Sequence, residues 1–249
     1  MQNIQGLIFT LVLGLFIVVG ALVVLLTKNN KKFIVFSLAL AFSVIVMLII
    51  TDLGAEALEA LGNDNVLYFI LFILLGFILL KALDLFVPDH EHHEHSSKKE
   101  EKSNLSHIGK LSSIAICLHN IIEGMAIYST MVTNLGVGLM ISLGVGLHNI
   151  PLGMAITSTL YQSNKDKKKT IFYISLLALS TFIGGLILFV FGNHISEFVL
   201  GVLLSLTTGM LLYISLCELL PRIIHTEDKK VTALGLILGV VVIGITLFL

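Results

Sequence analysis

The sequence is poor in charged residues, in cysteine and in tryptophan, and each shortage narrows what the protein can be. Only 12% of its 249 residues are charged and 56% are hydrophobic, whereas a soluble domain is about a quarter charged. A soluble globular domain is therefore excluded. Cys117 and Cys217 both lie inside apolar segments and do not imply a disulfide framework. Because tryptophan is absent, an aromatic belt at a membrane surface would rest on Tyr and Phe alone.

The apolar residues come in runs of about 20, long enough to cross about 30 Å of hydrocarbon. We predict an all-α polytopic membrane protein with eight transmembrane helices in a single transmembrane domain over 1–249. The first run lacks a basic segment before it and a small-residue cleavage site, so we expect a retained span and not a signal peptide. The expected spans are 4–27, 33–52, 64–87, 110–130, 135–160, 171–192, 197–221 and 231–249.

The basic residues indicate the orientation of these spans. All 15 Lys and Arg fall on one side, in or beside the connections that follow spans one, three, five and seven. Since cytoplasmic loops are enriched in Lys and Arg, we expect this side in the cytoplasm and both termini outside the cell membrane. The acidic loop expected between spans two and three either concentrates cations at an entrance or is ordinary solvated loop charge. The opposite side carries Asp52, Glu56, Glu59, Asp64 and Glu197 and no cation.

The longest connection lies between spans three and four. Residues 88–109 have few apolar side chains, so we expect a disordered cytoplasmic loop. Histidine-rich tracts bind transition metals, which makes its histidines candidate auxiliary ligands with a role in buffering or handing on metal. The alternative is a solvated linker. These histidines are His90, His92, His93 and His95.

Two polar motifs lie inside the fourth and fifth apolar segments. They are His119-Asn120-Ile121-Ile122-Glu123-Gly124 and His148-Asn149-Ile150-Pro151-Leu152-Gly153. An isolated acidic group at the centre of a membrane helix costs roughly 2.5 kcal/mol or more, so such groups persist where they face a protein interior and have a role there. His119 and Glu123 are four residues apart and lie about 40° apart around a helix. With a second His-Asn pair on the next helix, they can form a metal site.

The proline in the second motif adds to this interpretation. Pro151 cannot donate a hydrogen bond to the carbonyl of Leu147, and freed carbonyls at membrane depth are tolerated where they line a cavity, commonly a cation site. The alternative for the whole set is polar contact between helices. Glu218, three residues before Pro221, is either an auxiliary ligand on an exit path or a helix-end residue that reaches the headgroups. The candidate metal ligands are His119, Asn120, Glu123, His148 and Asn149.

The donor types predict the metal. Two imidazoles and one carboxylate suit zinc and its late-row neighbours better than manganese, calcium or magnesium, which prefer oxygen-rich shells. Zinc is the expected ion, with Fe2+, Cd2+, Co2+ and Mn2+ as alternatives. Protons compete with metal for imidazole, so binding is expected to weaken as pH falls.

The two motifs resemble the signature of spans four and five in the ZIP (Zrt/Irt-like) divalent metal transporters. Eight spans, external termini and a His-rich loop between spans three and four are similar too, and the segment from Gly209 to Pro221 resembles the seventh-span pattern. The resemblance implies an inverted 3+2+3 helix arrangement and import of a divalent metal, usually zinc, into the cytoplasm. It also implies a homodimer and an elevator-like movement of spans one, four, five and six against two, three, seven and eight. Neither enzymatic activity nor a nucleic-acid partner is expected.

Two positions depart from the pattern of that family. Many members have glutamate where this chain has Leu152, and many bacterial members have one where alignment on Gly184-Gly185 places Thr181. Those carboxylates help to build a second metal position, so a binuclear site is doubtful here. Two other functions remain open: an intramembrane zinc hydrolase, which would use the metal to activate water, and a transporter working as an exporter.

Overall fold

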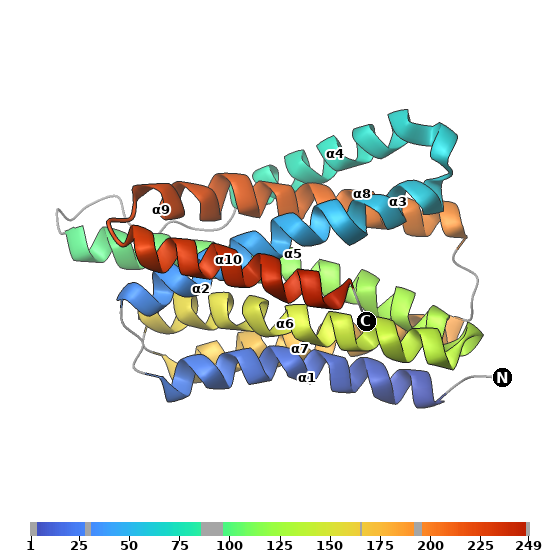
Figure 1. The fold of residues 1–249 in the computed structure, drawn as a ribbon, viewed down its shortest axis with the longest axis horizontal. Helices are drawn as coiled ribbons and strands as arrows, with labels where there is room; N and C mark the ends of the chain where they lie inside the picture. The colour runs from blue at the N-terminus through green and yellow to red at the C-terminus, as the bar shows by residue number, and fades with distance from the viewer. Residues whose placement is uncertain (1–3, 28–30, 86–96, 165, 192–195, 248–249) are drawn as a thin grey trace.

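The computed structural model describes residues 4–27, 31–85, 97–164, 166–191 and 196–247, and it is helical almost throughout these ranges (Figure 1). Within them, eight helical stretches are long and apolar enough to cross a membrane, which confirms the predicted fold class. The α-helices are α1 (Ile4–Leu26), α2 (Lys31–Leu48), α3 (Gly54–Leu61), α4 (Val66–Asp84), α5 (Ser97–Thr133), α6 (Leu135–Asn164), α7 (Lys167–Phe191), α8 (Glu197–Tyr213), α9 (Leu220–His225) and α10 (Lys229–Thr246).

Each of two short π-helical segments joins two α-helices into one span. The segment η1 (Ile49–Leu53) links α2 to α3, and η3 (Ile214–Leu219) links α8 to α9. The second has a local cause: Pro221 has no N–H, so the ladder of i→i−4 hydrogen bonds cannot continue through it. A 3-10 turn, η2 (Asn63–Asn65), precedes α4. Single π turns inside α-helices often occur at functional sites, and these two carry Asp52 and Glu218.

The second span is longer than predicted. It was expected to end at residue 52 and to be followed by an acidic loop, but Lys31–Leu61 is one helical stretch. The prediction of a loop is therefore wrong for Asp52, Glu56 and Glu59, which lie on η1 and α3. The segment is rich in Ala, Leu and Glu, which are strong helix formers, and this outweighed the charges that suggested the end of the span.

The connection between spans three and four is shorter than predicted. Residues 97–109 of the expected disordered loop form the first turns of α5 instead. The four clustered histidines, His90, His92, His93 and His95, lie outside the described residues.

The helices pack as two groups. The first helix group is α1, α5, α6 and α7, and the second is α2 with η1 and α3, α4, α8 with η3 and α9, and α10; Figure 1 shows α1, α6 and α7 along one side and α4 and α8 along the other. A side chain at Gly124 of α5 would collide with the Thr181 carbonyl of α7, and one at Gly76 of α4 with the Leu206 carbonyl of α8. Among the described glycines, no backbone contact this close joins the two groups. The division matches the one implied by the family resemblance.

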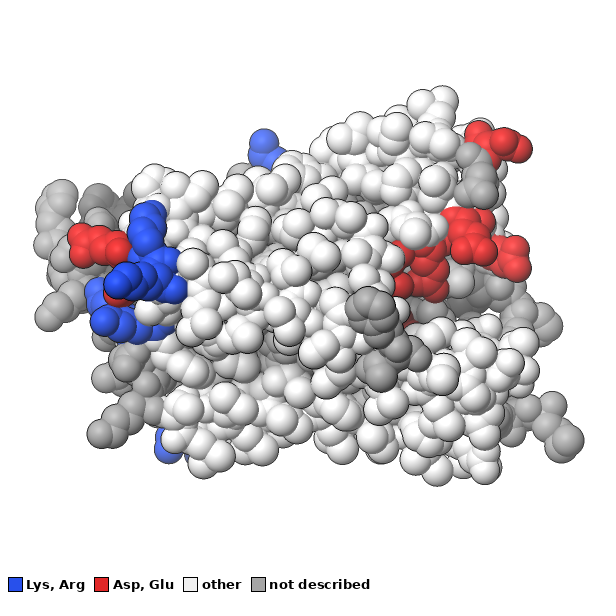
Figure 2. Space-filling model, in the orientation of Figure 1, with Lys and Arg blue, Asp and Glu red and all other residues white. Residues whose placement is uncertain are grey.

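The charged side chains gather at the two ends of the helices. Figure 2 shows Asp and Glu at the end where α3 lies and Lys and Arg, with a few acidic side chains among them, at the end where α9 lies; an uncharged band lies between the two ends. We call the first the acidic end and the second the basic end. The band exposes large aliphatic side chains, such as Leu67, Leu74 and Ile78 of α4, as expected where a helix faces lipid. The acidic end includes Asp52 of η1, Glu56 and Glu59 of α3 and Asp64 of η2, and the basic end includes Lys31 and Lys32 at the start of α2, Arg222 of α9 and Lys229 and Lys230 at the start of α10.

Candidate metal site

Three of the predicted ligands meet between α5 and α6. Glu123 Oε1 lies 2.9 Å from His148 Nε2 and 3.6 Å from His119 Nε2. The two imidazole rings are 6.2 Å apart between centroids and tilted by 39°. One ligand atom from each of these residues lies within 4.8 Å of the others. Two ligands of one tetrahedral zinc ion lie roughly 3.3 Å apart, so the spacing suits a single shared ion.

The triad is buried, and part of its bonding capacity is unused. The side chains of His119 and His148 are 1% and 2% exposed, and that of Glu123 is 10% exposed. His119 Nε2 and Glu123 Oε2 have no hydrogen-bond partner among the described residues. Buried polar atoms are almost always bonded, and each exception asks for an explanation, such as an ion that belongs there. A cation between the three side chains would satisfy both atoms.

The local packing of α5 explains how the triad is held. Gly124 and Gly184 bring α5 and α7 into backbone contact, and Asn120 Nδ2 donates to the Leu177 carbonyl of α7 at 3.3 Å. Asn120 thus anchors the helix that carries His119 and Glu123. Its Oδ1 has no partner within the described ranges.

The fifth span contributes His148 from an unbroken helix. Pro151 lies inside α6, and the helix continues through it from Leu135 to Asn164. Asn149 is fully buried, and neither of its amide atoms has a partner among the described residues. The roles of Asn120 and Asn149 as metal ligands remain predictions.

The two positions where the family has carboxylates hold groups with little affinity for metal. Leu152 is 1% exposed and belongs to the main hydrophobic cluster. Thr181 is fully buried, its carbonyl packs against Gly124, and its hydroxyl has no partner in the described part of the chain. The triad therefore carries a single carboxylate.

Two cavities connect the triad with the acidic end. One, of about 320 Å³, is lined by residues that include Asp52 and His148. The other, of about 280 Å³, is lined by residues that include Asp52, Glu56, Glu59 and Glu123. Asp52, on η1, lines both cavities, so the acidic residues expected in a loop instead line the approach to the site.

A second cluster of candidate ligands lies near the basic end. Asp84 of α4, His107 of α5 and Glu218 of η3 have ligand atoms within 4.8 Å of one another. His107 Nε2 is 2.5 Å from Asp84 Oδ1, and the Tyr213 hydroxyl donates to Asp84 Oδ2 at 2.7 Å. The prediction of Glu218 as an auxiliary ligand gains two neighbours that the sequence did not reveal. The available signal was that Asp84 and His107 stand at the facing ends of spans three and four.

Comparison with known proteins identifies the family. The model of the ZIP zinc transporter family matches residues 87–247, more than half of the chain. The zinc transporter ZupT of Clostridium perfringens is 30% identical over 278 residues, which cover 100% of this chain and 97% of the relative. The zinc transporters ZupT of Chlorobium chlorochromatii and Escherichia fergusonii are 31% and 29% identical, with 96% and 97% of this chain and 95% of each relative covered. The chain therefore belongs to the ZIP zinc transporter family and is a multi-pass membrane protein that transports zinc or a similar divalent metal, not an enzyme.

Proposed function

We propose that the chain imports zinc into the cytoplasm and that His119, Glu123 and His148 hold the ion on its way. The observation that carries this proposal is the buried triad with two unbonded ligand atoms at the inner end of cavities from the acidic end. An ion entering there would exchange its water for two imidazole nitrogens and a carboxylate oxygen.

The donor set supports zinc as the cargo. Two nitrogens and one oxygen match the ligands that zinc accepts, and a fourth position left to water keeps the ion exchangeable. A closed four-ligand protein site would hold zinc too tightly for a carrier. The single carboxylate at the triad supports one bound ion at a time.

The distribution of charge supports the orientation of the protein in the membrane, and the family resemblance supports import. Positively charged loops remain in the cytoplasm, so the basic end faces the cytoplasm and the acidic end faces outward, with both termini outside. Asp52, Glu56 and Glu59 would then raise the local concentration of cations at the entrance. Export is the alternative, and it predicts net movement from the basic end to the acidic end.

The cluster near the basic end fits the release side of this path. Asp84, His107 and Glu218 could take the ion after it leaves the triad, which gives Glu218 the auxiliary role predicted for it. The ion would have to displace the contact between His107 and Asp84. We retain the homodimer as a prediction from the family.

Zinc flux in sealed membrane vesicles of known orientation tests the proposal. Vesicles containing the wild-type chain and a zinc-sensitive dye are compared with vesicles that contain Glu123→Gln. We expect zinc to accumulate when it is added at the acidic end and the flux to fall to background in the variant, because Gln lacks the negative charge of the only carboxylate at the triad. Glu197→Gln is the matched control, since Glu197 is exposed in the first turn of α8.

Each departure from this result has a clear meaning. Flux that runs only from the basic end would replace import by export. Folded wild-type protein with no zinc flux in either orientation would contradict the transport function itself. Full flux in Glu123→Gln would remove the triad from the path.

A further inference from the structure

The path toward the basic end is closed beyond the triad. A gap of only about 10 Å³ remains between α2, α5, α6 and η3, with room for about one water molecule. The side chains around it are mostly aliphatic, among them Leu38, Ile45, Ile116 and Leu219. Because two of these elements belong to each helix group, the gap lies on the boundary between the groups. We call it the aliphatic seal, and its lining residues are Leu38, Ala41, Ile45, Ile108, Ser112, Ile116, Ala155, Ile156, Thr159, Ile214 and Leu219.

One polar side chain in the seal is not satisfied. Ser112 is 6% exposed, and its hydroxyl has no hydrogen-bond partner among the described residues. Thr159, the other polar residue of the seal, bonds back to the carbonyls of Ala155 and Ile156 at 3.0 and 2.9 Å. Ser112 is the only buried serine in the described ranges whose hydroxyl lacks a partner.

The neighbouring serine shows what an ordinary buried hydroxyl does in this helix. Ser113 is 5% exposed and donates to the carbonyl of Gly109 at 2.6 Å. Serine hydroxyls in helices commonly bond back in this way. Two adjacent serines of similar burial therefore differ in one respect: Ser113 is satisfied within its helix, whereas the hydroxyl of Ser112, a residue that lines the gap, has no partner among the described residues.

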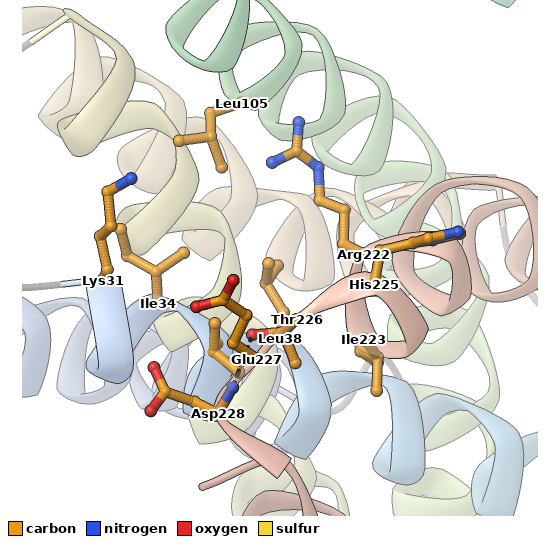
Figure 3. A pocket seen from close by; sticks show the side chains of 11 residues that line it. Lys31, Ile34, Leu38, Leu105, Arg222, Ile223, His225, Thr226, Glu227 and Asp228 are labelled. Carbon is orange, nitrogen blue, oxygen red and sulfur yellow. Dashed lines mark hydrogen bonds between the residues drawn. The ribbon is translucent and has the colours of Figure 1, made fainter. Parts of the chain in front are cut away.

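Beyond the seal a wide cavity opens to the basic end. It has a volume of about 410 Å³, and Leu38 lines both this cavity and the seal. Figure 3 shows Lys31 and Arg222 on opposite sides of it, with Glu227 between them in this view. The seal is thus the narrow point between the triad and a space that reaches the surface.

We propose that Ser112 is a pathway residue for zinc on the release side: when the helix groups move apart at the seal, its hydroxyl lines the opened route and contacts the hydrated ion. A buried hydroxyl without a partner is unfavourable in the closed state, so opening, which supplies water or an ion as a partner, removes that penalty. Ser112 lies seven residues before His119 on α5, about 10 Å along the helix axis toward the basic end. This inference rests on the proposed transport function.

Reaction of introduced cysteines with a charged thiol reagent tests the inference. The background carries Cys117→Ala and Cys217→Ala, and zinc flux is first measured in it. Ser112→Cys and Ser113→Cys are then compared, with the membrane-impermeant reagent added at the basic end. We expect the cysteine at 112 to react at least about tenfold faster than the one at 113, because local opening governs access to buried groups. Zinc should slow the reaction of the cysteine at 112, because an ion on the opened route would cover it.

A second pair of variants separates a pathway role from a structural one. Ser112→Ala removes an unsatisfied hydroxyl, so it should leave thermal stability unchanged or raised while zinc flux falls about threefold. Ser113→Ala should leave flux unchanged. Equal reactivity at 112 and 113, or unaltered flux in Ser112→Ala, would overturn the inference if the background transports zinc. If the folded wild-type protein and the background without cysteine both lack zinc flux, the result would instead count against the transport function.

Discussion

The two His-carboxylate clusters of this protein have similar ligands but different surroundings. At the triad, His119 and Glu123 each keep one buried ligand atom without a hydrogen-bond partner in the described structure. In the cluster at the basic end, one oxygen of Asp84 contacts His107 and the other accepts a hydrogen bond from Tyr213. An ion at the triad would displace the contact between His148 and Glu123 but would find two ligand atoms without a partner, whereas at the basic end both oxygens of Asp84 are already in contact with other side chains. The difference suggests a selecting site and a weaker transfer site.

The largest expected effect comes from removing one histidine from each cluster. His119→Ala should abolish zinc flux, because it leaves two protein ligands at the buried site. His107→Ala should lower flux by about two- to fivefold. The effect is smaller because the variant removes one ligand from a site whose side chains already contact one another and therefore bind the ion more weakly. Zinc flux and equilibrium zinc binding are measured for both. Equal losses in the two variants would break the proposed distinction between the clusters.

A large effect on stability is expected where the triad depends on close helix packing. Gly184→Ala places a methyl group against the Ile121 carbonyl of α5, and overpacking of this kind costs about 1–3 kcal/mol. The matched control is Gly244→Ala, since no atom lies within 4 Å of a side chain there. Because the chain has no tryptophan, unfolding is followed by circular dichroism. A Gly184→Ala protein as stable as Gly244→Ala would show that α5 and α7 can separate without loss.

An intermediate effect is expected from pH. Protons compete with zinc for the imidazole nitrogens of the triad, so the apparent KM for zinc should rise as pH is lowered from about 7.5 to about 5.5. The maximal rate at saturating zinc should change much less, because excess metal displaces the protons. The measurement is initial flux against zinc concentration at each pH. An unchanged KM would contradict ligation of zinc by the two histidines of the triad.

The smallest effect is expected at the acidic end. Asp52→Asn should lower flux by about two- to threefold at low salt and low zinc, because Asp52 lines both outer cavities and attracts cations. The difference should disappear at high ionic strength, where the field is screened. Asp64→Asn is the control, since Asp64 is exposed at the same end and lines neither cavity. A loss of flux that persists in high salt would give Asp52 a direct role in binding.

The sequence was sufficient for the spans and for the triad. Hydropathy alone locates eight helices, and the spacing of His119 and Glu123 places them on one helical face. The antiparallel connection of spans four and five then brings His148 opposite them. These are local properties, which is why they could be predicted.

The sequence was insufficient where tertiary packing decides. The placement of Asp52 on the two outer cavities depends on the residues of other helices that line them, such as Ile141 and Val145 of α6. The contact between Asp84 and His107 depends on how α4 and α5 rotate about their axes, and no pattern in either segment specifies this. The unpartnered hydroxyl of Ser112 is likewise visible only when its neighbours on α2 and η3 are known.

The most direct test of the central claim is the position of zinc in crystals soaked with the metal, located by anomalous diffraction at the zinc absorption edge. We predict one strong peak at about 2.0–2.2 Å from His119 Nε2, His148 Nε2 and a carboxylate oxygen of Glu123, and its loss in His119→Ala. A peak confined to Asp84, His107 and Glu218, or a peak at the triad that persists in His119→Ala, would contradict the account.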